Sequence, residues 1–121
     1  DTVAADKTHR GHAIIEQVHA DLKAGPLAHL PSGVFTANSA WLVIAVIAFN
    51  LTRAAGLIAD RAGRLARATT ATIRRTLIHV PARLARSARR ITLHLPEAWP
   101  WQTAFDRLFT ATHAPPPTVT T

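Results

Sequence analysis

The sequence predicts an α+β fold that is mainly helical and carries one β-hairpin. Three observations support this fold class. Apolar residues recur at helical spacing near the start of the chain, as at Ile15, Val18 and Leu22. Residues 40–49 are apolar throughout except for one indole N–H, as in a helix buried at the centre of a domain. Residues 90–95 alternate between polar and apolar side chains, which is typical of a half-buried strand.

The composition limits both size and chemistry. The 121 residues have room for one domain or for part of a larger one, and a hydrophobic content of 48% is sufficient for a packed core. The chain has no cysteine, which excludes disulfides, a thiolate nucleophile and a cysteine zinc site. It also has no methionine, so we expect Asp1 to lie within a longer reading frame or to follow processing. No secretory signal pattern is present at the start.

The first half of the chain predicts two helices. The first spans about 8–24 and ends at the Gly25-Pro26 pair. The second spans about 37–56, with Thr36 or Asn38 as its N-cap. Its apolar run is shorter than the roughly 20 residues of a membrane span, so we expect a buried helix and no membrane partner. The chain is too short to surround this helix, which predicts packing against something larger.

The second half predicts a hairpin and a third helix. The stretch from Gly56 to Thr72 is a basic, alanine-rich linker or a frayed helix extension. A hairpin is expected at about 73–95, with its turn near Ser87-Ala88, although Pro81 weakens the first strand and residues 82–90 also fit a helical turn. The last helix, about 100–110, completes a domain at 1–110, and 111–121 is expected to be a disordered tail. Its apolar stripe requires a surface to pack on; the residues are Trp101, Phe105, Leu108 and Phe109.

The net charge of +7 is localised in the second half. Between Arg53 and Arg90 there are ten arginines and one acid, Asp60. Arginine presents a planar fork that suits phosphate, so this density indicates a polyanion partner such as nucleic acid. If about six of these side chains met phosphates, log affinity would fall with log salt at a slope of about −5. The alternative is a solvated basic face that reflects arginine-rich codon usage.

Glu16 is the residue of greatest chemical interest. By helix spacing alone it is an ordinary solvated acid on a polar face. His12, Glu16 and His19 have a spacing that permits a metal site, but they lack the form of known zinc motifs. The sequence contains no glycine-rich phosphate loop and no nucleophile elbow.

Several segments, in order along the chain, resemble the C-terminal part of a bacterial insertion-sequence transposase of the DDE type, group one. The resemblance extends from about position 8 to 110. The segments are RGHAIIEQVHADLK (10–23), LAHLPSG (27–33), the stretch 41–53, TATIRR (70–75), VPARLARSARR (80–90), LHLP (93–96), and WPW (99–101) with Phe105, Leu108 and Phe109.

The resemblance implies a ribonuclease H-like fold and a role in DNA transposition and recombination. In this family three carboxylates bind two divalent metal ions, Mg²⁺ or Mn²⁺, and the third carboxylate is a Glu on a late helix. Glu16 matches that position, as a catalytic residue and metal ligand. Two hard cations held by oxygen ligands activate the attacking hydroxyl and stabilise the leaving oxygen of a phosphodiester. Contacts with the DNA backbone are expected from Arg10, Lys23, Arg53, Arg74, Arg75, Arg83, Arg86, Arg89 and Arg90.

The first two aspartates of the triad are missing from the pattern. Asp1 and Asp6 lie too close to Glu16 and lack strand-like neighbours. We therefore expect a fragment that binds no metal tightly and does not cleave DNA by itself. Its partners would be transposon-end DNA, the missing N-terminal part of the transposase and other copies of the chain, in the cytoplasm and associated with the nucleoid.

Two other functions account for part of the sequence. A non-catalytic, arginine-rich nucleic-acid-binding protein explains the charge. A helical protein that anchors to a membrane or partner through 40–49 explains the apolar run, but that run lacks the charged opposite face of such helices.

Overall fold

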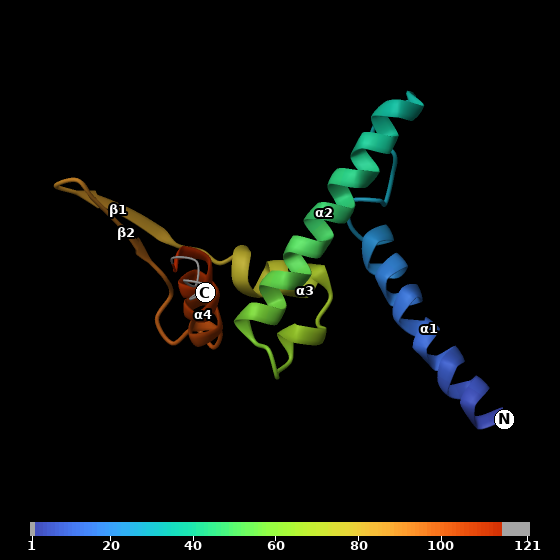
Figure 1. The fold of residues 1–121 in the computed structure, drawn as a ribbon. Coiled ribbons are helices and arrows are strands. Elements are labelled where there is room, and N and C mark those ends of the chain that lie inside the picture. The colour runs from blue at the N-terminus through green and yellow to red at the C-terminus, as the bar shows by residue number, and fades with distance from the viewer. Residues whose placement is uncertain (1, 115–121) are drawn as a thin grey trace, which may run out of the picture. The chain divides into compact units, whose positions relative to one another are not determined.

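The computed structural model describes residues 2–114, except for the side chains of residue 7 and residues 9–13. The fold is mostly helical with one two-stranded antiparallel hairpin, which confirms the α+β class at this level (Figure 1). The elements, in chain order, are α1 (Thr2–Lys23), α2 (Phe35–Ala59), the 3₁₀ turn η1 (Leu65–Arg67), α3 (Thr70–Ile73), the π turn η2 (Arg74–Ile78), β1 (Arg83–Ser87), β2 (Arg90–His94) and α4 (Gln102–His113).

The chain divides into two compact units, and the boundary falls inside α2. Unit 1 is Asp1–Leu51 and unit 2 is Thr52–Thr121. Unit 1 contains α1 and most of α2, whereas unit 2 contains the last turns of α2 and everything that follows.

Helix α1 begins earlier than the sequence predicted, at Thr2 instead of about position 8. Thr8 lies within the helix, and its hydroxyl donates to the Ala4 carbonyl oxygen at 2.9 Å. The helix ends at Lys23, as expected, because the chain turns at Gly25: its N–H and that of Leu27 both donate to the Leu22 carbonyl oxygen. Leu22 is the buried residue of this end.

Hydrogen bonds from α2 fix the loop between the helices of unit 1. The Trp41 indole N–H donates to the Pro26 carbonyl oxygen at 2.9 Å. The Asn38 amide donates to the Ser32 carbonyl oxygen at 2.8 Å and accepts from the Ser32 N–H. The predicted N-cap is therefore wrong: α2 already begins at Phe35, and Asn38 lies inside its first turn, where its side chain holds the loop.

Helix α2 is longer and more exposed than a buried core helix. Only 17% of its most apolar stretch is buried, and Val43, Ile44 and Ile47 are all more than half exposed. Ala45 is the buried residue in the middle of this run. By length and composition α2 is sufficient to cross a membrane, contrary to the expectation of too short a run, although one such helix is weak evidence of a span. The exposure agrees with the expectation that this chain does not cover the helix.

Unit 2 has a small core built around two fully buried side chains, Leu65 and Ile73. The rest of the cluster consists of Ala59, Leu77 and Ala104, with Ala68, Trp101, Phe105 and Leu108 packed against it. The Asp60 carboxylate accepts the Leu65 N–H at 3.1 Å, which fixes the chain as it leaves α2. The stretch 56–72 therefore contributes to the core and is not a linker.

Residues 70–78 are helical, so the prediction of a strand over the first part of 73–95 is wrong. The Thr69 side chain caps α3 by accepting the Thr72 N–H at 3.3 Å. Ile73 and Leu77 both enter the core, whereas Arg75 between them is exposed. A strand would place all three on one face, so this burial fits a helix despite the β-branched composition. Pro81 lies beyond the end of this helix.

The hairpin is formed by 83–94 alone. The Ser87–Arg90 pair closes the ladder around a two-residue turn, within one position of the predicted turn. Ala88 and Arg89 both have positive φ, 43° and 68°, as two-residue hairpin turns require. All side chains of the two strands are exposed except that of Ala85, in the middle of β1, which is half-buried.

Helix α4 begins at Gln102 and continues to His113, past the predicted end at 110. Three aromatic rings stack along one side of it: the ring centroids of Phe105 and Phe109 lie 6.2 Å apart, and those of Phe109 and His113 lie 4.0 Å apart. Trp101, Phe105 and Leu108 pack on the unit 2 core, so this chain itself supplies most of the surface that the stripe requires. Of the predicted disordered tail, 111–113 are helical and 115–121 lie outside the described residues.

Candidate functional site

Glu16 lies in the second half of α1 and is exposed to solvent. His19 and Lys23 follow at three and seven residues and are also exposed, so the three side chains share one side of the helix. The side chains of Arg10 and His12 lie outside those that the structure describes. What the structure presents here is one carboxylate with a basic and an imidazole neighbour.

The described side chains do not assemble a metal centre. Across that part of the chain, no group of three His, Asp or Glu side chains is placed to hold a metal ion. Hard divalent cations require several oxygen ligands, and Glu16 supplies only one carboxylate. These residues by themselves therefore do not fit the two-metal site implied by the family resemblance.

The hairpin concentrates positive charge on an exposed ribbon. Arg83, Arg86, Arg89 and Arg90 are all exposed, and residues 83–94 contain no acid. Because side chains alternate along a strand, the register places Arg83 and Arg90 on one face and Arg86 on the other, with Arg89 in the turn. A two-stranded ribbon has the dimensions that the major groove of B-DNA admits. The hairpin thus has the size for a DNA groove and carries arginines on both faces and in its turn.

Arg53 differs from the other predicted DNA contacts. Its guanidinium donates to the carbonyl oxygens of Ala68 and Ala66, the latter at 2.9 Å, and the side chain is half-buried. These bonds hold the carbonyl end of η1 against α2 within unit 2. Arg53 thus has a structural role, whereas Lys23, Arg74 and Arg75 are exposed and accessible to a ligand.

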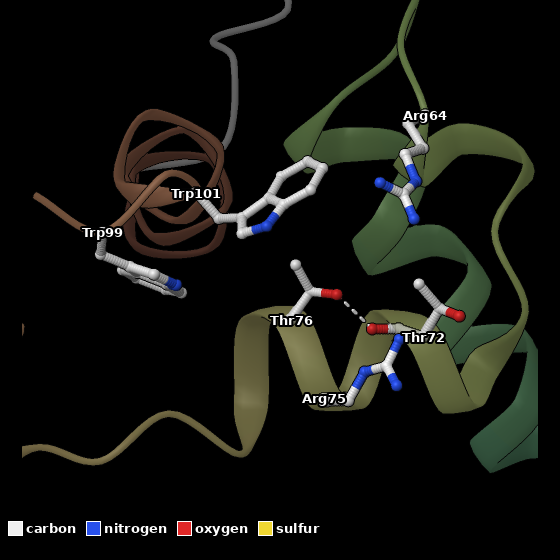
Figure 2. A pocket seen from close by; sticks show the side chains of 6 residues that line it. All are labelled: Arg64, Thr72, Arg75, Thr76, Trp99 and Trp101. Carbon is white, nitrogen blue, oxygen red and sulfur yellow. Dashed lines mark hydrogen bonds between the residues drawn. The ribbon is translucent and has the colours of Figure 1, made fainter.

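Unit 2 also contains a cavity of about 320 Å³ that joins basic and aromatic side chains (Figure 2). Arg64 comes from the segment before η1, Arg75 from η2, and two indoles from the segment leading into α4. The lining residues are Arg64, Thr72, Arg75, Thr76, Trp99 and Trp101. The lining thus has two arginines and no carboxylate.

The sequence did not predict this cavity. Trp101 was assigned to an apolar stripe, and Arg75 was one of many expected backbone contacts. Trp99, Arg64 and the two threonines carried no functional assignment. The closely spaced Trp99 and Trp101 beside an arginine-rich region were the available signal, because tryptophan and arginine together are typical of sites that bind nucleotides.

A family model described as the transposase DDE domain, group 1, matches residues 5–115. The match covers most of the chain, which therefore belongs to this transposase family. The resemblance seen in the sequence is confirmed at this level. No curated protein and no solved structure matches the chain.

Proposed function

We propose that this chain acts in DNA transposition, as a C-terminal segment of a metal-dependent transposase that cleaves and joins DNA at the ends of an insertion sequence. The observation that carries the proposal is the family match over 5–115. In this proposal the catalytic domain has a ribonuclease H-like fold, and the exposed Glu16 on α1 is its third metal-binding carboxylate. The other two carboxylates come from a part of the transposase outside these residues.

Because the described residues contribute a single carboxylate to that site, we propose that the isolated chain is inactive and binds no Mg²⁺ or Mn²⁺ tightly. The bound metals would supply activation of the attacking hydroxyl and stabilisation of the leaving oxygen. Glu16 contributes an oxygen ligand, and its exposure leaves it accessible to the rest of the enzyme.

We propose that the exposed arginines hold DNA close to that site. The hairpin, with Arg83, Arg86, Arg89 and Arg90, carries the densest charge, and its contacts with phosphates would position the duplex without reading its sequence. Lys23, Arg74 and Arg75 add to this surface, and Arg10 belongs to the predicted set. The protein would act where its DNA lies, in the cytoplasm at the nucleoid.

A nicking assay tests the catalytic proposal. The chain is joined to an upstream transposase segment that carries the two aspartates, and supercoiled DNA with insertion-sequence ends is incubated with Mg²⁺. Glu16→Gln is expected to abolish nicking, whereas Glu97→Gln, which removes another exposed acid, retains it. Full nicking by the Glu16 variant would refute the assignment. Metal-dependent nicking by the 121 residues alone, lost in Glu16→Gln, would refute the proposed inactivity.

A second candidate is a non-catalytic, arginine-rich DNA-binding protein. The exposed hairpin favours it, and so does the lack of a metal-binding group among the side chains that the structure describes. It predicts salt-sensitive DNA binding and no effect of Glu16→Gln in any DNA assay. The nicking assay therefore separates the two candidates.

A further inference from the structure

We propose that the cavity of unit 2 binds one unpaired nucleotide of DNA, with its phosphate between Arg64 and Arg75 and its base against Trp99 and Trp101. The inference rests on the proposed function in taking DNA as the ligand. It adds a second site, separate from Glu16, that recognises a base that has left the duplex.

The charges of the lining select an anion. Arg64 and Arg75 are exposed and line the same cavity from different elements, as Figure 2 shows, and the proposal places one phosphate between them. Each presents a planar fork of donors that matches phosphate oxygens. Since the lining contains no carboxylate, no acidic side chain of the lining competes with a bound phosphate for the two arginines.

The aromatic part of the lining selects a flat ring. Trp101 is half-buried and packs against the unit 2 core, and Trp99 lies with its ring centroid 5.6 Å from that of Phe105. These contacts hold both indoles in place while each still borders the cavity. A held aromatic ring is a stacking platform for any base, and stacking of this kind tolerates all sequences.

The hydroxyls and the volume agree with a single nucleotide. The Thr76 hydroxyl donates to the Thr72 carbonyl oxygen, so toward a ligand it is an acceptor for a base N–H. The Thr72 hydroxyl accepts from that of Thr69 at 3.1 Å and retains its own hydrogen to donate. A cavity of about 320 Å³ is at the small end of ligand pockets, which excludes a duplex from the interior.

The test compares three DNA probes by fluorescence anisotropy with the full chain. They are a short duplex with a one-nucleotide bulge, the same duplex with an abasic bulge, and the fully paired duplex. Free dAMP serves as a competitor. We expect the intact bulge to bind about tenfold more tightly than either control, because the abasic bulge keeps the phosphate but lacks the stacking base, and the paired duplex presents no unpaired nucleotide. Equal binding of the intact and abasic bulges would overturn the proposal. Competition by free dAMP at the affinity of the bulge would overturn the assignment to DNA.

Matched charge variants identify the cavity as the site. Arg64→Gln with Arg75→Gln is expected to remove the preference for the bulge. Arg61→Gln with Arg67→Gln removes the same charge from exposed arginines that neither line the cavity nor belong to the predicted DNA contacts, and is expected to retain the preference. Equal effects of the two pairs would overturn the proposal, because general electrostatic attraction falls equally in both.

Two further variants keep the test decisive. Trp101 packs on the core, so its replacement risks unfolding, and Trp99→Leu is therefore the aromatic variant to use. This variant is expected to lose the preference for the bulged duplex while its far-ultraviolet circular dichroism stays unchanged. Retention of the preference by folded Trp99→Leu would count against the stacking role. Glu16→Gln is expected to leave the preference intact, so failure of the catalytic proposal and failure of this one give different results.

Discussion

The charge on the hairpin predicts a specific change in the salt dependence of DNA binding. The perturbation is the triple variant Arg86→Gln, Arg89→Gln and Arg90→Gln, at exposed positions near the tip of the ribbon. Each phosphate contact contributes about −0.9 to the slope of log affinity against log salt on duplex DNA. If all three side chains meet phosphates, the variant slope is less steep by about 2.7.

The assay is fluorescence anisotropy with one labelled duplex over a series of salt concentrations. The control is Arg61→Gln, Arg67→Gln and Arg107→Gln, three exposed arginines of unit 2 outside the predicted contacts, with the same loss of net charge. We expect the control slope to stay within about one of the unmodified chain, by the same rule of one phosphate for each contact. Equal slopes for the two triple variants would refute a hairpin-centred interface.

Three other predictions concern stability and association. Ile73→Ala, at a fully buried site, is expected to lower the free energy of unfolding of unit 2 by about 2–5 kcal/mol, measured by urea unfolding with tryptophan fluorescence. Ile91→Ala, on the exposed strand, is expected to lower it by less than about 0.5 kcal/mol. Similar losses for the two variants would contradict the assigned core. Gly56→Ala would place a Cβ 2.9 Å from the Leu65 carbonyl oxygen and 2.6 Å from Ile73 Cδ1. The overpacking should cost about 1–3 kcal/mol of stability, more than the gain of about 1 kcal/mol from the higher helix propensity of alanine. Gly33→Ala meets open space and should leave the free energy of unfolding close to unchanged in the same measurement. The exposed apolar side of α2 is expected to cause concentration-dependent association in sedimentation velocity, reduced by Ile47→Lys, and a sharply melting monomer would argue against it.

Local patterns predicted the elements whose residues carry a consistent signal. The two-residue turn of the hairpin was placed within one position because β2 alternates cleanly over 90–95. The strand prediction fails over residues 73–78 because β-branched side chains favour a strand locally. Exposure of Arg75 between the buried Ile73 and Leu77 decides for a helix, because a strand would place all three on one face. That burial depends on α4, about thirty residues further along the chain.

The candidate site was predicted only where a family pattern exists. The sequence alone makes Glu16 an ordinary exposed acid, and the structure agrees that it is exposed; its proposed role comes from the family. The cavity had no such guide. Arg64 and Trp99 are far apart in sequence, and only folding of unit 2 brings them to one lining.

The π turn at Arg74–Ile78 makes chain length a determinant of ligand specificity. Its backbone hydrogen bonds join residues five apart, as from the His79 N–H to the Arg74 carbonyl oxygen, whereas those of an α-helix join residues four apart. Deleting one residue there would restore α-helical geometry and rotate the following side chains by about 100° around the axis. Thr76 lines the cavity and Leu77 fills the core, so such a deletion would alter both together. Relatives that differ by one residue in this turn should therefore differ in what their cavity accepts, even with every lining residue type retained.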